Sequence, residues 1–232
     1  MAQPPDITQT FVREVDENLR RDQLRDFFKK YANLLIAGVV LFLAASGGFI
    51  WWKQQQVQRS EAQVEQLAQT YKDVGSGDLS KAPQQLDELS KSGSKAVRAS
   101  ALFARAAIAV QQNDVKLATT TYKRIVDDSS FPKPYRNAAL IRQTALEFDR
   151  LESQQVISRL QPLAKAGEPW FGSAGEMTAL AMLKQGRKQE AGRLYAAIAK
   201  DPGVPETIRA RAMQIAGSLG VDASGAFPTK AQ

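Results

Sequence analysis

An apolar run from residue 31 to residue 52 constrains this chain more than any other feature. It contains no Asp, Glu, Lys or Arg, and lysines resume immediately on both sides. As an α-helix it would extend about 33 Å, enough to cross the hydrocarbon core of a bilayer. A buried core helix is the alternative, but such helices seldom carry the aromatic residues found at both ends here. The sequence therefore predicts a transmembrane helix, with interface residues Lys29, Lys30, Tyr31, Trp51, Trp52 and Lys53.

The charges that flank the span predict its orientation. Six Lys or Arg residues lie in the twenty residues before it and three in the twenty after it. Because cytoplasmic flanks carry the cationic excess, residues 1–30 should form a cytoplasmic tail. A cleaved signal peptide with its core at residues 34–43 is the rival interpretation. The thirty-residue leader with its six acidic residues, and the continuation of the apolar run to Trp52, favour an uncleaved anchor.

About 180 residues remain after the span, enough for one domain, and composition limits what that domain can do. The chain has neither Cys nor His, so it lacks a thiol nucleophile and the commonest general base. It shows no phosphate-binding loop, dinucleotide fingerprint or zinc spacing. Its net charge of +7 is not gathered into a nucleic-acid-binding block. We therefore expect no enzyme, no cofactor, no metal site and no nucleic-acid partner, and we expect membrane lipid as one partner.

Residues 53–93 read as a helical stalk followed by a first helical hairpin. Apolar or small residues recur there at alternating intervals of four and three, a narrow seam for one neighbouring helix. That neighbour is either the chain's own domain or a second copy in a parallel homodimer. A short helix near residues 81–91 should follow. The seam residues are Val57, Ser60, Val64, Leu67, Tyr71 and Val74.

Helical segments alternate with short breaks over residues 94–220, and residues 221–232 read as a disordered tail. Ala118, Tyr122 and Ile125 recur as Ala191, Tyr195 and Ile198, each set beginning five residues after Asn113 or Gly186. Val156, Leu160 and Leu163 share the register, although Leu151 stands where the turn residue should be. The intervals of 38 and 35 residues match the tetratricopeptide class, of about 34 residues. The predicted fold is all-α: one transmembrane helix and an α-solenoid of tetratricopeptide-like helix pairs. Helices are expected near 95–112, 115–127, 134–149, 152–165, 173–185, 188–200 and 204–218.

Two sets of residues are candidates for contacts with partners. Ala44 and Gly48 have the small-xxx-small spacing that lets membrane helices approach, although lipid tolerates such residues too. Arg98, Arg105 and Arg142 lie on the expected first helices of repeats, which line the concave side of tetratricopeptide folds. They would form a partner groove, or else belong to the solvated surface.

Four aromatics beside prolines form a ligand pocket or plug the joints between helix pairs: Phe131, Tyr135, Trp170 and Phe171.

The layout resembles a known family. The segment Phe27-Phe28-Lys29-Lys30 enters a single span, Trp51-Trp52-Lys53-Gln54 leaves it, and a tetratricopeptide-like domain follows. This arrangement is similar to the YfgM-type family, an ancillary subunit of the SecYEG translocon. The resemblance implies a bacterial inner-membrane protein with a periplasmic domain. It would bind the translocon and periplasmic chaperones and assist the hand-over of exported proteins. On the residues alone, a membrane-tethered scaffold for envelope assembly or cell division is the alternative.

Overall fold

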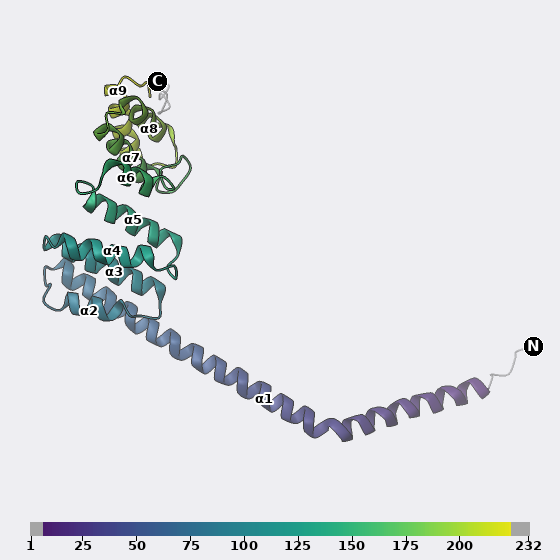
Figure 1. The fold of residues 1–232 in the computed structure, drawn as a ribbon. Coiled ribbons are helices and arrows are strands. Elements are labelled where there is room, and N and C mark those ends of the chain that lie inside the picture. Colours follow the sequence, from purple (N-terminus) through teal and green to yellow (C-terminus); the bar gives the residue numbers. More distant parts are fainter. Residues whose placement is uncertain (1–6, 224–232) are drawn as a thin grey trace, which may run out of the picture. The chain divides into compact units, whose positions relative to one another are not determined.

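The computed structural model describes residues 7–223 of the 232-residue chain, with side chains from Ile36 onward except that of Arg59. The chain divides into two compact units, Met1–Glu61 and Ala62–Gln232. Within the described residues every regular element is a helix, as predicted (Figure 1). The helices are α1 (Ile7–Gly75), α2 (Ala82–Leu89), α3 (Lys95–Gln111), α4 (Val115–Asp127), α5 (Lys133–Glu147), α6 (Ser153–Leu160), α7 (Phe171–Lys184), α8 (Lys188–Lys200) and α9 (Glu206–Ser218).

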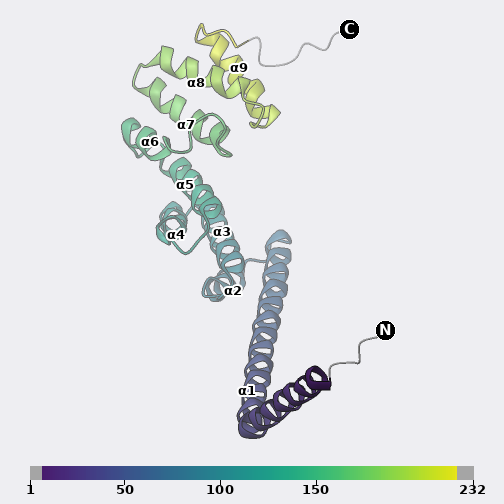
Figure 2. The same cartoon turned by 90° about the vertical axis from the view of Figure 1, so that its right-hand side faces the viewer.

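Helices α2 to α9 of the second unit follow one another in chain order, as Figures 1 and 2 both show. Sequential neighbours pack together: α3 on α4, α4 on α5, α6 on α7, α7 on α8 and α8 on α9. In these pairs each helix lies against the next one in the chain, so most contacts are local in sequence. This is how a repeat protein builds its core, because each helix pair buries its apolar face on its neighbours.

The predicted turn residues have the backbone that the repeat requires. Asn113 and Gly186, which precede α4 and α8, adopt positive φ angles of 60° and 75°. Glycine and asparagine enter this left-handed region at the least cost. Leu151 stands at the corresponding position before α6, where the helix start is stabilised in another way. Helix α6 begins with a capping box in which the side chains of Glu152 and Gln155 bond each other's backbone N–H groups.

The repeat register is confirmed by burial. All nine predicted register residues have 5 % or less of their surface exposed, so the period identified the core-facing side of each second helix. Phe131 and Phe171 are also buried, and Tyr135 and Trp170 pack partly buried against neighbouring clusters. These aromatics therefore plug joints between helices. The nine register residues are Ala118, Tyr122, Ile125, Val156, Leu160, Leu163, Ala191, Tyr195 and Ile198.

One predicted helix end was wrong, for a physical reason. Helix α6 ends at Leu160 and not near residue 165, because Pro162 lacks the backbone N–H that would continue the helical hydrogen bonds. The first residues of the range predicted as a tail are described in the structure. Val221 and Ala223 join the last apolar cluster, and Val221 lies so close to Gly192 that a Cβ there would approach its Cγ2 to 2.6 Å. Residues 224–232 of the predicted tail lie outside the described residues.

The seam of the stalk divides into two sides. Leu67 and Val74 pack in a cluster with residues of α2 and α3. Val64 is 53 % exposed and Tyr71 is 44 % exposed, and the partly covered Tyr71 hydroxyl donates to the Ser100 carbonyl at 3.1 Å. Burial raises the pKa of this tyrosine above its ordinary value. Packing on the chain's own domain, the first of the two predicted interpretations, is thus observed for part of the seam.

Candidate functional site

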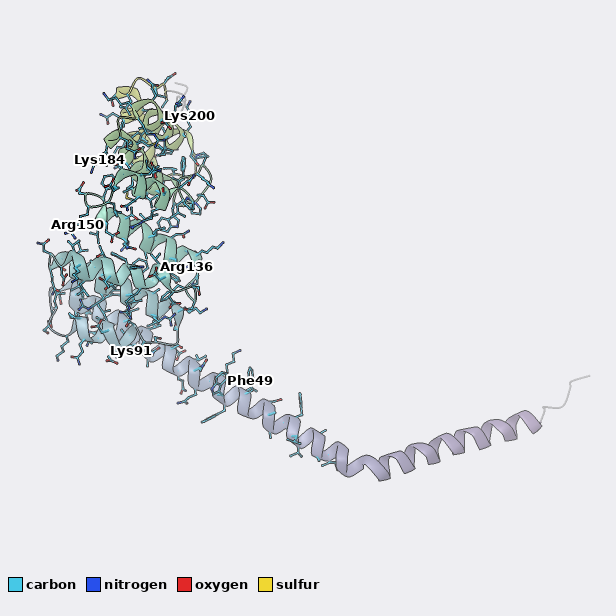
Figure 3. The ribbon with its side chains drawn as sticks, in the orientation of Figure 1. Phe49, Lys91, Arg136, Arg150, Lys184 and Lys200 are labelled. Atoms are coloured by element: carbon cyan, nitrogen blue, oxygen red, sulfur yellow. The ribbon has the colours of Figure 1, made fainter. Side chains whose placement is uncertain are left out.

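The apolar part of α1 is exposed to its surroundings along its described length. The large side chains between Ile36 and Trp52 each expose more than half of their surface. Phe49, labelled in Figure 3, stands out from the helix, and its ring centroid lies 6.4 Å from that of Trp52. Among the described residues, one stretch is long and apolar enough to cross a membrane, and it is this part of α1. None of its apolar part is buried. An exposed apolar surface of this kind needs a lipid or protein environment.

The predicted membrane residues can be placed in part. Ala44 and Gly48 are exposed, and a Cβ at Gly48 would meet no atom within 4 Å. The surface expected to receive another helix is therefore open. Trp51, Trp52 and Lys53 are likewise exposed at the end of the apolar stretch. Lys29, Lys30 and Tyr31 are in helix α1, but their side chains lie outside the described set.

Arg98 of α3, one of the predicted groove residues, makes contacts within its own domain. Its Nη2 lies 3.1 Å from the Asp128 carboxylate and also donates to the Ser130 hydroxyl. Its guanidinium carbon lies 4.4 Å from the centre of the Phe131 ring. The Ser130 hydroxyl and N–H, with a further contribution from Arg98, lower the pKa of Asp128. Arg98 thus joins α3 to the loop after α4.

Arg105 and Arg142 make intramolecular contacts too, and they differ in accessibility. Arg105 Nε lies 3.3 Å from Asp87 Oδ1, with 16 % of the arginine side chain exposed, so this residue links α3 to α2. Arg142 of α5 is exposed, and its guanidinium carbon lies 5.2 Å from the centre of the Phe103 ring of α3. Of the three predicted arginines, Arg142 is the most exposed.

A pocket of about 450 Å³ lies among α6, α7 and α8. Ile157 and Ala164 on its wall pack against one apolar cluster, and Met182 and Leu194 pack against the next. The pocket therefore lies at the seam between two successive clusters of the repeat domain. Its remaining lining residues are polar: Gln161, Thr178, Arg187, Glu190 and Arg193.

Thr178 is the most buried residue of this lining, with 4 % of its surface exposed. Its hydroxyl has no hydrogen-bond partner among the described residues. Other helical threonines in this structure donate to the carbonyl four residues earlier. They are Thr70, Thr119, Thr120, Thr121 and Thr144. A buried hydroxyl without a partner is unfavourable, so Thr178 stands out from the threonines that are satisfied within their own helix.

Two polar residues of the pocket form a bidentate ion pair. Arg187 donates from Nε and Nη2 to the two carboxylate oxygens of Glu190 at 2.8 and 2.7 Å. These bonds lower the pKa of Glu190 and raise that of Arg187. Arg193 and Gln161 are exposed on the lining. Two arginines against one glutamate leave the lining with a net charge of +1.

Sequence reasoning missed this pocket because its members are spread over three helices. Ile157 and Leu194 fit the apolar pattern of a repeat, and Thr178 resembles any helical threonine. The unpaired hydroxyl depends on the rotamer and neighbours of one side chain, which no spacing rule reports. The arginine contacts were missed for a similar reason, since Arg98 and Asp128 are thirty residues apart in the chain.

Comparison with known proteins gives one match. The model of the tetratricopeptide repeat-like domain matches residues 25–215. The chain belongs to this family. No curated protein and no solved structure matches the chain.

The match includes both the apolar stretch of α1 and the helices that follow it. Tetratricopeptide repeat-like domains are typically non-catalytic modules that bind other proteins, and stacked repeats provide extended surfaces for that purpose. The match indicates no enzymatic family. A protein-interaction role is therefore the one that the fold and the family support.

Proposed function

We propose that this protein is a membrane-anchored adaptor of the bacterial inner membrane, with its repeat domain in the periplasm. In this role it binds the SecYEG translocon and periplasmic chaperones and assists the hand-over of newly exported proteins. The observation that carries the proposal is the exposed, uncharged stretch from Ile36 to Trp52, joined within one chain to a tetratricopeptide repeat-like domain. An anchor and an interaction module in one chain hold the module beside membrane partners.

Two further features support the details. The excess of Lys and Arg before the span favours a cytoplasmic N-terminus, which sends the repeat domain across the membrane. The resemblance of the entry and exit segments, Phe27-Phe28-Lys29-Lys30 and Trp51-Trp52-Lys53-Gln54, to the YfgM-type family points to the translocon as the membrane partner. Exposed Ala44 and Gly48 provide a surface where a helix of that partner packs.

The exposed arginine of the repeat domain adds a candidate contact. Arg142 presents its guanidinium over Phe103 and is open to solvent. Arginine suits such a role because its planar fork pairs with carboxylates while its stem packs on apolar groups. The homodimer through the stalk stays a prediction, for which exposed Val57 and Val64 provide the apolar surface.

Photocrosslinking from the membrane exit tests the proposed function. A photoreactive residue is placed at Gln55 or Gln58 in living cells, and its products are identified by mass spectrometry. Translocon subunits and periplasmic chaperones are the expected products. Division or cell-wall proteins in their place would refute the translocon assignment and favour the envelope scaffold. The same residue at Lys200, exposed on α8, controls for products that form regardless of position.

A further inference from the structure

We propose that the pocket among α6, α7 and α8 binds an extended peptide segment through one aliphatic side chain, its backbone and a neighbouring acidic residue. This inference deepens the proposed function, since it names the chemistry of the partner that the repeat domain recognises. Three features of the pocket favour such a ligand: the unpartnered Thr178 hydroxyl, the apolar wall and the charge of the lining.

The apolar wall accounts for the aliphatic side chain. Ile157, Ala164, Met182 and Leu194 are only partly buried, so each still has apolar surface to lose to a ligand. A pocket of about 450 Å³ is within the range of about 300–1,000 Å³ usual for ligand sites. Burying the remaining apolar surface under an aliphatic side chain gains free energy in proportion to the area removed from water.

The Thr178 hydroxyl accounts for the peptide backbone. A hydroxyl both donates and accepts, so it can satisfy either the C=O or the N–H of a peptide group. The exposed Gln161 amide offers the same pair of functions on the pocket lining. Met182 lies one helical turn after Thr178, and its unbranched side chain has the freedom to move aside when a ligand enters. A bound peptide would thus pair the hydroxyl that the free protein leaves unpartnered.

The charge of the lining accounts for the acidic residue. Arg187 is engaged by Glu190 through two hydrogen bonds, whereas Arg193 is exposed and makes no hydrogen bond among the described residues. The net charge of +1 favours a carboxylate over an amine in the ligand. An acidic side chain next to the aliphatic anchor would pair with Arg193, and salt would weaken this contact because it is exposed.

Fluorescence polarisation with three synthetic probes tests the proposal, using the full chain in lipid nanodiscs. The first probe is fluorescein-Gly-Ser-Leu-Asp-Gly-Leu-Asp-Ser-Gly-amide. The second replaces both leucines by serine, and the third replaces both aspartates by asparagine. The first probe should bind at least about fivefold more tightly than either of the others. Equal binding of the first and second probes, or no binding of the first, would overturn the proposal.

Three variants locate the binding in this pocket. Thr178→Val should weaken the first probe about fivefold to tenfold, the loss of one hydrogen bond, without lowering the thermal midpoint, since no internal bond is removed. Arg193→Gln, at an exposed position, should remove the advantage of the first probe over the third. Thr144→Val is the matched control: its hydroxyl bonds the Leu140 carbonyl and it lies outside the pocket, so probe affinity should not change.

The results separate the pocket from the wider function. Wild-type affinity in both Thr178→Val and Arg193→Gln would refute the pocket, even if crosslinks from Gln55 still reach the translocon. Loss of those crosslinks with intact, variant-sensitive probe binding would refute the translocon role and leave the pocket standing. A Thr178→Val protein that fails to fold leaves the decision to Arg193→Gln.

Discussion

Substituting Gly175 with Ala tests the close packing of α7 on α8. A Cβ at this position would lie 2.8 Å from Ile198 Cδ1 and 3.2 Å from Ile198 Cγ1. Carbon atoms normally approach to about 3.5–4.0 Å, and Ile198 is fully buried, so its side chain has little room to move. Overpacking of this kind costs about 1–3 kcal/mol. The gain in helix propensity from Gly to Ala offsets about 1 kcal/mol of it. The free energy of unfolding should therefore fall by up to about 2 kcal/mol in Gly175→Ala.

Gly217→Ala is the matched control, because a Cβ at this glycine of α9 would meet no atom within 4 Å. This change should raise the free energy of unfolding by about 0.5 kcal/mol, since in the last turn of the helix only the higher helix propensity of alanine acts. Urea unfolding of residues 54–232, followed by circular dichroism, measures both variants. We expect this fragment to be soluble and helical, as residues from Ala62 onward form their own compact unit.

A double-mutant cycle identifies the overlapping atom. Ile198→Val removes the Cδ1 methyl and alone should cost about 0.5–1.5 kcal/mol. Combined with Gly175→Ala it should cost about 1 kcal/mol less than the sum of the single changes, because the overlap is relieved. Stabilisation by Gly175→Ala equal to that by Gly217→Ala would refute the close packing, and strict additivity would exclude Ile198 as its cause.

Three further predictions concern the repeat register, the link from α3 to α2 and the small residues of the apolar stretch. Tyr122→Ala and Tyr195→Ala should each cost about 3–5 kcal/mol in urea unfolding, because both rings are buried, and costs below about 0.5 kcal/mol would disprove the repeat register. Arg105→Ala should cost about 1–2 kcal/mol, mainly because it removes a largely buried stem, since Asp87 is 54 % exposed and stays hydrated without its partner; an unchanged unfolding midpoint would show the link to be without effect. Replacing Ala44 and Gly48 with Leu should preserve membrane insertion but reduce co-purification of membrane partners, whereas unchanged recovery would exclude this surface as their docking site.

The fold was predictable from the sequence where local rules and the repeat period agree. The bounds of α4 and α8 coincide with the predicted ranges, because a turn residue precedes each helix and an aspartate follows it. Asn113 and Gly186 could be assigned as turns since their residue types tolerate positive φ. The end of α6 was missed although Pro162 marked it, because the apolar pattern continues through Leu163 into the core without a helix.

The candidate sites were less predictable because side-chain contacts between helices decide them. Arg98 and Arg105 have the spacing of surface residues, yet each pairs with an acidic residue of another segment. Nothing in the spacing of Thr178 distinguishes it from Thr144, whose hydroxyl is satisfied by its own helix. The apolar stretch of α1 is the opposite case, because absence of charge over a long run is a property of the sequence itself.

Cysteine labelling in intact cells tests the anchored topology on which the proposed function depends. The chain has no cysteine, so a single introduced thiol is the sole target of a sulfonated maleimide that cannot cross the inner membrane. Cysteine replaces Asn18 in the predicted cytoplasmic tail in one variant and exposed Lys116 of α4 in the other. Lys116→Cys should react in intact cells, and Asn18→Cys only after the inner membrane is made permeable. Labelling of Asn18→Cys in intact cells, or protection of Lys116→Cys there, would contradict a membrane-anchored periplasmic domain.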